Sequence, residues 1–515
     1  MKIRALESSS AVGRFESGAQ RSHSRRNFAG HFISRERPEG RSLGAAAFPS
    51  TNNGFILLGV LILVMLISMI ALSLMFRLRA EETAAAATSG GDQAYAAAMT
   101  GVQEAMRVVK AIKPGFTDWE DDPRTFRERL VYDDGSDKWY FTIWSPGDKD
   151  REGEIRYGLT DESRKVNINA SRTNDLTKIP NMTTAMAAAL KDFVDFDDIV
   201  TPEGAEQEYY NGLPQPYTIR NGPLPTLDAL LQVRGFTPEL LYGEDANMNW
   251  RLDPNENDGD ERPPADNSDG NLDMGFKRFL TVYSTDPNTD NDGVPRTNLN
   301  DPNDPYKGVE YPSALTNFVN ELRKANLRLD NASDLLEAKI KVKDEKGVEH
   351  EIASEVGKVE LPLALDLFTT SALKTTDGLI NINTAPIEVL TTIPGIDEPL
   401  AESILSTRKS ISPEKRATIA WLFQEDVVDA EAFKRIAPYL TARGSQFSFQ
   451  VVGFGVPSGR FRRLEIVIDS SELTPRVVYL RDLTRLGAPF KLEPETTEAP
   501  KEARASETSE PLHRG

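Results

Sequence analysis

The chain has 515 residues and a formal net charge of −19, from 60 Lys and Arg against 79 Asp and Glu. It contains no cysteine and four histidines, which excludes disulfides, thiolate catalysis and iron–sulfur clusters and leaves too few ligands for a multi-histidine metal site. An acidic balance also disfavours binding to nucleic acid, whose phosphates require a basic surface. We therefore expect a binding or structural protein rather than an enzyme, although a hydrolase built from carboxylates alone is still open.

A membrane-spanning helix is predicted near the N-terminus. Residues 55–76 form a run of 22 without a charged side chain. As a helix this run measures about 33 Å, enough to cross a hydrocarbon core of about 30 Å. Residues 1–54 carry nine Lys and Arg against four Glu. Since basic flanks stay in the cytoplasm, we expect residues 1–54 to be cytoplasmic and the acidic bulk to be exported.

Cleavage by a signal peptidase is an alternative fate for this segment. Small residues follow the span at Ala80 and again at 84–87, where such an enzyme could cut. That cleavage would remove the apolar helix, whereas the membrane anchor requires it to be kept.

The helix is expected to continue beyond the membrane. Residues 80–112 are rich in alanine and carry one apolar stripe, and Lys113-Pro114-Gly115 should stop the helix. Ser89-Gly90-Gly91 should weaken it midway. The stripe recurs at spacings of three and four, through Ala94, Ala98, Val102, Ala105, Val109 and Ile112.

Strand patterns occur at both ends of the exported region. Residues 138–144 and 155–168 read as extended early in the chain, and residues 446–453, 462–469 and 477–481 read as strands late in it. We expect one antiparallel sheet assembled from both ends, with helical material inserted between them.

Two inserted segments match each other at a constant offset of 214 residues. Val166-Asn-Ile-Asn169 aligns with Ile380-Asn-Ile-Asn383, and Ile179-Pro180 aligns with Ile393-Pro394. Residues 224–235 have a similar spacing of apolar residues, Pro and Gly. The unit predicted is helix, short hairpin, helix, with apolar positions joining the pair and Pro or Gly making the turn.

Acidic loops between residues 243 and 304 are candidate calcium sites. In the first loop, oxygen donors occupy the positions of a twelve-residue EF-hand, with Trp250 where that loop normally needs glycine. Its ligands would be the side chains of Asp245, Asn247, Asn249, Asp253 and Glu256 and the backbone carbonyl of Arg251. Two weaker candidates are Asp266, Asp269 and Asp273, and then Asn288, Asp290 and Asp292. The predicted cofactor is structural calcium.

The junction before the apolar run reads Asn52-Asn53-Gly54-Phe55 and resembles the cleavage site of type IV prepilins and pseudopilins. In that family a membrane peptidase cuts after the glycine and methylates the new N-terminal phenylalanine. Many members carry glutamate at the fifth mature position, which is Gly59 here. The general secretion pathway protein K family, the minor pseudopilins of type II secretion, is similar in lacking that glutamate.

Other segments resemble the same family, in the same order. They are residues 221–235, the Asn-Ile-Asn-Thr-Ala-Pro segment within 381–395, and 437–443 leading into a strand at 447–452. The resemblance implies an α+β fold. A transmembrane and pilin spine helix would carry a small antiparallel pilin-like sheet and a large inserted, mostly helical domain of SAM-like, helix–hairpin–helix type. Members are also similar in having calcium sites in the helical domain.

The resulting domain prediction has seven parts. They are a basic leader at 1–54, a spine at 55–113, strands at 114–165, an inserted helical domain at 166–375, a helix–hairpin–helix-like subdomain at 376–440, strands at 441–485 and a disordered tail at 486–515.

The resemblance implies a non-enzymatic role at the tip of the secretion pseudopilus, initiating or capping the filament that exports folded proteins across the outer membrane. The protein would be single-pass in the inner membrane with its bulk in the periplasm. Its expected partners are the other minor pseudopilins, the major pseudopilin, the prepilin peptidase and the inner membrane, and nucleic acid is not expected.

Two other functions are open. Residues 381–408 also resemble the helix–hairpin–helix of membrane-anchored DNA receptors, but Asp397 and Glu398 would face the phosphate there. Salt-sensitive retention on DNA would favour that function. A calcium-dependent exported enzyme would need a cleft with two close carboxylates of raised pKa.

Overall fold

The computed structural model describes residues 53–148, 154–170, 175–259, 261–304, 312–343 and 348–494. The chain forms two units, Met1–Leu78 and Arg79–Gly515. The predicted basic leader lies outside the described residues up to residue 52.

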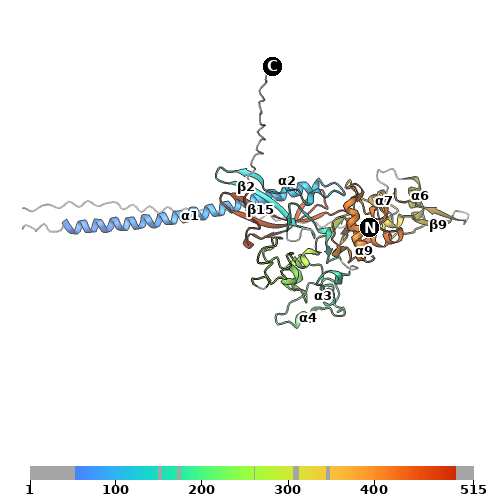
Figure 1. Cartoon of the computed structure of the whole chain (residues 1–515), viewed down its shortest axis with the longest axis horizontal. Helices are drawn as coiled ribbons and strands as arrows, with labels where there is room; N and C mark the ends of the chain where they lie inside the picture. The colour runs from blue at the N-terminus through green and yellow to red at the C-terminus, as the bar shows by residue number, and fades with distance from the viewer. Residues whose placement is uncertain are drawn as a thin grey trace, which may run out of the picture. The chain divides into compact units, whose positions relative to one another are not determined.

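Helix α1 (Asn53–Lys110) is the longest element (Figure 1). In the first unit its side chains from Ile56 onward are exposed, most of them by more than half. Among the described residues, Ile56–Lys110 is the one helix long and apolar enough to cross a membrane. The helix continues through Ser89-Gly90-Gly91 without a break, against our expectation, and ends at Lys110, shortly before Pro114.

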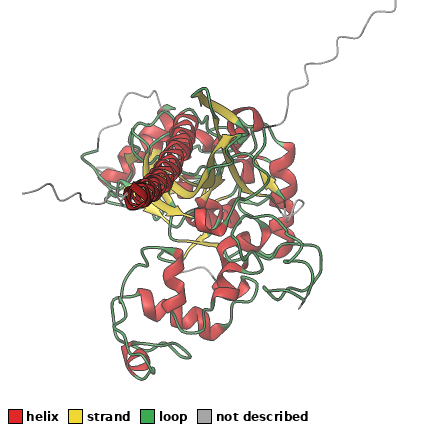
Figure 2. Ribbon diagram, turned by 90° about the vertical axis from the view of Figure 1, so that its left-hand side faces the viewer, coloured by secondary structure: helices red, strands yellow, loops and turns green. Residues whose placement is uncertain are grey.

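The second unit is built around one antiparallel sheet (Figures 1 and 2). Its strand order is β1-β2-β15-β16-β17, and short strands β3 and β4 pair with β2 and β15. The strands are β1 (Arg129–Asp133), β2 (Lys138–Pro146), β3 (Ile155–Arg156), β4 (Thr160–Asp161), β15 (Gln446–Val456), β16 (Phe461–Asp469) and β17 (Arg476–Asp482). Strands β2 and β15 are direct neighbours although the whole insert separates them in sequence, which confirms a sheet assembled from both ends.

The second half of α1 packs on one face of this sheet. Its stripe from Ala98 to Val109 is buried against Phe141 of β2, Val451 of β15 and Ile466 of β16. The contact is close because both sides carry small residues. A Cβ on Gly453 would lie 2.0 Å from the carbonyl oxygen of Ala94. The predicted stripe is confirmed, and Ile112 packs at its edge.

Between β4 and β15 the described residues form short helices and five small two-stranded ladders. The α-helices are α3 (Thr184–Val194), α4 (Gln207–Asn211), α5 (Pro238–Tyr242), α6 (Ser313–Lys324), α7 (Leu361–Leu367), α8 (Ile387–Leu390), α9 (Glu398–Ser410), α10 (Trp421–Gln424) and α11 (Ala430–Ile436); α2 (Pro123–Phe126) precedes the sheet. The ladders pair β5 (Val166–Asn167) with β6 (Leu280–Thr281), β7 (Thr285–Pro287) with β12 (Thr375–Asp377), β8 (Thr297–Asn298) with β11 (Phe368–Thr369), β9 (Lys339–Lys343) with β10 (Glu349–Ala353), and β13 (Ile380–Asn381) with β14 (Leu440–Thr441). One apolar core runs through the insert from Val166 to Ala442.

The two matching segments fold alike. In each, a short strand enters a parallel ladder, and the second asparagine of the motif donates its backbone N–H to the side chain of the first, at 3.0 Å, in Asn167–Asn169 and in Asn381–Asn383. The turn that follows has a residue of positive φ, Asn181 (65°) or Gly395 (93°), two positions before the N-cap of the next helix. The third segment repeats this with Gly235 (90°) before α5.

Three expectations need correction in detail. Residues 155–168 do not form one strand, because a bend separates β3 from β4 and a 3-10 helix, Glu162–Arg164, separates β4 from β5. The insert is less regular than "mostly helical", since long loops and short ladders join its helices. The disordered tail predicted at 486–515 includes residues that the structure describes: the Phe490 ring packs edge-on against Trp144 at 5.2 Å between centroids, while residues 495–515 lie outside the described part of the chain.

Candidate functional site

The first acidic loop, residues 245–256, docks on the sheet face opposite α1. Trp250 of the loop shares a small apolar cluster with Trp144 of β2 and Val452 of β15. Polar side chains reach the loop backbone from the same face. Gln450 donates to the carbonyl oxygen of Met248 at 2.6 Å, and Arg463 donates to that same oxygen. The loop is therefore part of the contact between the insert and the sheet.

Within the loop, the predicted ligands already converge by hydrogen bonding. The Asp245 carboxylate accepts the backbone N–H groups of Asn249 (2.9 Å) and Trp250 (3.0 Å). The Glu256 carboxylate accepts those of Ala246 and Asp253, both at 3.1 Å. Positions one and twelve of the loop are thus closed onto its interior, as a cation-binding EF-hand requires.

The middle positions complete the arrangement. Asn247 and Asn249 both donate their side-chain amides to one oxygen of Asp253, at 2.7 and 2.8 Å. Asn249 also accepts the backbone N–H of Arg251 at 2.7 Å. Among the described residues, the carboxylates of Asp245, Asp253 and Glu256 do not all come within 4.8 Å of one another.

Trp250 adopts the backbone conformation that glycine normally supplies. Its φ is +64°, in the left-handed region, at the sixth position of the loop. Burial of its ring against the sheet and under the Lys277 ammonium, 5.9 Å from the ring centroid, holds it there. The departure from the EF-hand pattern therefore leaves the turn intact, and it attaches the loop to the sheet.

Burial raises the pKa of both end carboxylates. Asp245 is 4% exposed and its pKa rises to about 6, while Glu256 is 1% exposed and its pKa rises to about 7. The neighbouring acids Asp245 and Asp253 add to the shift at Glu256. Buried carboxylates of this kind favour a cation, which would return both groups to their charged form. The residues present fit calcium, since every donor is a hard oxygen.

The second candidate, with Asp266, Asp269 and Asp273, is held by backbone amides. Asp266 accepts the N–H groups of Asp258 (3.0 Å) and Gly259 (2.9 Å), while Asp269 and Asp273 each accept an N–H two residues ahead. These are turn contacts, and each carboxylate already has donors. They give calcium no additional support here.

The third candidate, around Asn288, Asp290 and Asp292, lies beside an arginine. Arg443 donates its Nε to Asp286 at 3.0 Å and its other nitrogens to the carbonyl oxygens of Pro287, Thr289 and Asp290. Asp290 accepts the N–H groups of Asp292 and Val294. The Arg443 guanidinium thus supplies the positive charge of this loop. This favours a direct attachment of the loop to Arg443 over a cation site.

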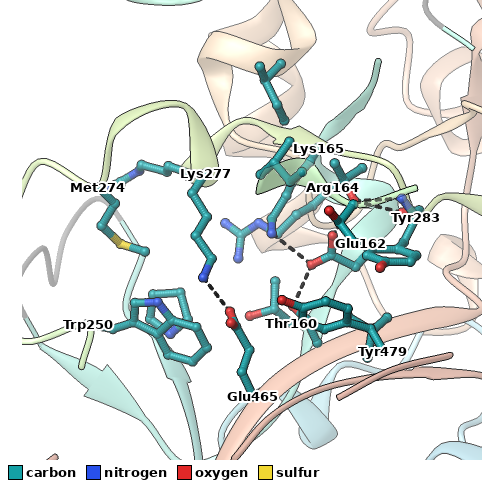
Figure 3. A pocket seen from close by; sticks show the side chains of 18 of the residues that line it. Thr160, Glu162, Arg164, Lys165, Trp250, Met274, Lys277, Tyr283, Glu465 and Tyr479 are labelled. Carbon is teal, nitrogen blue, oxygen red and sulfur yellow. Dashed lines mark hydrogen bonds and ion pairs between the residues drawn. The ribbon is translucent and has the colours of Figure 1, made fainter. Parts of the chain in front are cut away.

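A pocket of about 90 Å³ lies beside the first loop (Figure 3). Trp250 and Met274 form its apolar side, and two ion pairs, Lys277 with Glu465 and Lys165 with Glu162, lie across it. Burial acts to raise the pKa of Glu465, but the Lys277 ammonium outweighs it and the pKa is lowered. Paired charges of this kind hold two parts of a fold together.

Sequence reasoning missed Trp144, Gln450 and Arg463, which bind the loop from the sheet. Trp144 donates its indole N–H to the Asn249 carbonyl oxygen at 3.3 Å, and Arg463 donates to the Gln450 side chain at 2.8 Å. A signal was available, because buried polar residues stand at alternate positions of apolar strands. Such residues mark a strand face that meets something polar.

Of the predicted cleavage site, the structure shows only the backbone. Gly54 and Phe55 lie in the first turn of α1, which begins at Asn53. Gly59 has no heavy atom within 4 Å of the position of an added Cβ.

Comparison with known proteins supports the family resemblance. Residues 167–242 match the model of a family described as Type II secretion system (T2SS), protein K. No curated protein matches the chain. Among solved structures, the GspK-GspI-GspJ complex of the enterotoxigenic Escherichia coli type 2 secretion system is similar at 12% identity and a TM-score of 0.36, covering 79% of this chain and 99% of that one.

Proposed function

We propose that this chain is a minor pseudopilin at the tip of the secretion pseudopilus, because residues 167–242 match the model of the type II secretion protein K family. It would initiate or cap the filament that exports folded proteins across the outer membrane. The role is mechanical, with no catalysed reaction.

The character of α1 is the observation that carries this proposal. Its first part presents apolar side chains such as Ile56 and Leu61, each 65% exposed, while from Ala94 onward its small side chains are buried on the sheet. An isolated apolar surface of that length needs lipid or other helices to cover it. A bundle of similar helices in the inner membrane and in a filament would provide both.

The N-terminal end of α1 supports the tip position. Processing by a prepilin peptidase between Gly54 and Phe55 would leave the apolar part of α1 at the new N-terminus. Gly59 offers no carboxylate for the amine of a subunit beneath it. The proposed partners are accordingly the major pseudopilin and the other minor pseudopilins, together with the peptidase and the membrane.

We assign a structural calcium ion to the first acidic loop. The ion would bind Asp245, Asp253 and Glu256 and stiffen the contact that Met248 makes with Gln450 and Arg463. Calcium would thus fix the insert on the sheet, and it takes no part in chemistry.

The hairpin before α9 is not proposed as a DNA site. Asp397 caps this helix, and its carboxylate accepts the N–H of Leu400 at 3.0 Å. A phosphate would need that amide and would meet the aspartate charge.

Immunogold labelling of pseudopili tests the role. A tag fused after Gly515 should place gold at one end of filaments formed from excess major pseudopilin. Gly54→Val, which blocks cleavage, should abolish this labelling, whereas Asn53→Ala should keep it. Gold spread along the filament, or none with normal amounts of mature protein, would refute a tip subunit.

A further inference from the structure

Basic side chains from several segments line one polar cavity beside the C-terminal end of α9. The cavity has a volume of about 210 Å³. Its described lining consists of four basic residues, two acids and three uncharged polar residues: Arg164, Arg408, Lys409 and Arg416; Glu120 and Asp148; and Thr117, Asn383 and Thr384. Four positive charges against two negative ones leave an excess of two positive charges when both acids are ionised.

Arg416 is the basic residue of this cavity that lacks a partner. Its Nε is buried and donates no hydrogen bond. Among the described residues its guanidinium forms no ion pair, whereas the neighbouring Lys415 pairs with Glu425 at 2.5 Å. A buried N–H group without an acceptor has lost its hydration and gained nothing in exchange. This side chain is therefore suited to an acceptor from outside the described chain.

Arg408 is a second guanidinium without a carboxylate partner among the described residues. Its Nη1 donates to the carbonyl oxygens of Ile382 (3.3 Å) and Ala385 (2.6 Å), which fixes the side chain in place. Burial lowers the pKa of Arg408 to about 10, and the like charges of Arg164 and Arg416 lower it further. The three guanidiniums are thus close enough to repel one another.

The two acids of the cavity do not offset all of this charge. The Asp148 carboxylate is engaged by Arg164, at 2.8 Å. The Glu120 carboxylate forms no ion pair among the described residues, and burial raises its pKa although three arginines act to lower it. A carboxyl group that resists ionisation neutralises its surroundings poorly. Arg416 therefore has no counterion in the described part of the chain.

We propose that this cavity binds a free divalent oxyanion of the phosphate or sulfate class. Guanidinium groups present N–H donors in pairs that match the oxygens of such an anion. The excess of two positive charges equals the charge of the anion. About 15 Å³ of such volume hold one water molecule, so the cavity has room for the anion and for waters around it. Every described lining residue is polar or charged, which offers no place for a lipid chain.

The anion would connect parts of the second unit that are far apart in sequence. Asp148 follows β2, and Arg164 ends the 3-10 helix between β4 and β5. Arg408 and Arg416 lie in and after α9, at the end of the second repeat. A bound anion would thus fasten this repeat to the segments that border the sheet. The site is independent of calcium and of the role at the filament tip.

Calorimetric titration of inorganic phosphate into the purified full chain in detergent, in a buffer free of phosphate and sulfate, tests the proposal. One phosphate ion should bind per chain. Sulfate should compete with it, whereas acetate at the same concentration should not. Arg416→Gln should weaken phosphate binding by about tenfold or more, because charge-assisted hydrogen bonds are lost. Arg416→Lys keeps the charge without the paired donors and should retain part of the affinity.

The matched control is Lys415→Gln, which removes the same charge from the adjacent residue. Its side chain is 54% exposed and pairs with Glu425 outside the cavity. Because solvent and salt screen an exposed charge, this variant should bind phosphate within about twofold of the wild type.

Thermal unfolding provides a second readout. Phosphate should raise the melting temperature of the wild type and of Lys415→Gln more than that of Arg416→Gln. Without phosphate, Arg416→Gln should be at least as stable as the wild type, because repulsion between like charges is relieved.

The proposal is overturned if the wild type and Arg416→Gln bind phosphate equally, or if the wild type binds none and Arg416→Gln lowers the melting temperature, which would make Arg416 a structural residue only. Equal competition by acetate would contradict a divalent oxyanion. Tighter binding of glycerol 3-phosphate than of phosphate would contradict a free ion and indicate a lipid headgroup instead.

Discussion

Gly453 determines how closely the spine helix approaches the sheet. It lies in the central strand β15, where a Cβ would come within 2.0 Å of the Ala94 carbonyl oxygen and 2.4 Å of the Ala98 nitrogen. Both are backbone atoms of α1, so neither can turn aside. Helix and strand would have to separate, and the apolar contacts around Ala98 and Val451 would loosen with them.

We therefore expect Gly453→Ala to destabilise the protein by about 1–3 kcal/mol, the usual range for overpacking a core. Urea unfolding followed by tryptophan fluorescence measures this. Gly357→Ala is the matched control, since its nearest neighbour would be Oε2 of Glu360 at 3.5 Å. Equal midpoints for the two variants would show that α1 and β15 are not in close contact.

Asp161 is a buried acid in β4 that connects the sheet to the second repeat. It accepts hydrogen bonds from Asn381 (2.7 Å) and Thr384 (2.9 Å). Burial raises its pKa from 3.8 to about 6, more than these donors lower it. The folded state therefore holds a proton that the unfolded state has released, and stability falls as the pH rises from about 4 to 6.

The expected loss over that interval is about 3 kcal/mol, from about two pKa units at 1.36 kcal/mol each. Asp161→Asn should make this part of the stability profile shallower by about that amount, measured by urea unfolding at several pH values, while Asp245 and Glu256 keep the remaining slope. An exposed acid, as in Asp397→Asn, serves as the control and should keep the slope. A profile unchanged by Asp161→Asn would mean that another group titrates.

At the scale of single residues, the sequence predicted the oxygen donors of the first acidic loop but not the residues that contact this loop. The spacing of Asp245 and Glu256 was enough to predict a closed loop. Polar residues at alternate strand positions indicate that a strand face meets something polar, but they do not say what. That Gln450 and Arg463 bind this loop could not be inferred, because they are about two hundred residues away and only the strand pairing brings them near. Trp250 departs from the EF-hand pattern, which has glycine at this position. In the folded protein its buried ring attaches the loop to the sheet.

The first acidic loop makes an element-scale prediction. Without calcium, Asp245 and Glu256 are buried acids of raised pKa, so neutralising both should change the chelated protein little or stabilise it. With calcium, the wild-type chain should gain several degrees in melting temperature and the Asp245→Asn, Glu256→Gln variant should gain less. Differential scanning calorimetry measures both.

The control replaces two acids of the third loop, Asp290→Asn and Asp292→Asn, where Arg443 supplies the charge. This variant should retain the full calcium effect. If instead it loses the effect and the first-loop variant keeps it, calcium binds around residues 288–292.

Elements with strong local periodicity were predictable, and short ladders were not. Strands β2, β15, β16 and β17 and the stripe of α1 follow directly from alternation or helical spacing. The pairing of β9 with β10 was missed because both strands are short and rich in charge, with Lys and Glu on one face and only a few apolar side chains on the other. The repeat was visible because its asparagines and prolines make the same turns in both copies.

At the scale of the whole molecule, the sheet is assembled from strands that precede the insert and strands that follow it in sequence. A sheet built from both ends was predicted from the strand patterns there, and the pairing of β2 with β15 confirms it. The way the insert is held could not be predicted, since it depends on a docked loop, buried ion pairs and Asp161. The ion pairs and Asp161 leave no regular pattern in sequence, and the spacing of the loop does not show where it docks.

Intact mass spectrometry of the protein from membranes of the producing cells tests the central proposal most directly. A minor pseudopilin should begin at Phe55, with one N-terminal methyl group, and should retain the whole of α1. A protein that keeps residues 1–54, or one that begins near Ala84 and has lost the apolar half of the helix, would contradict it.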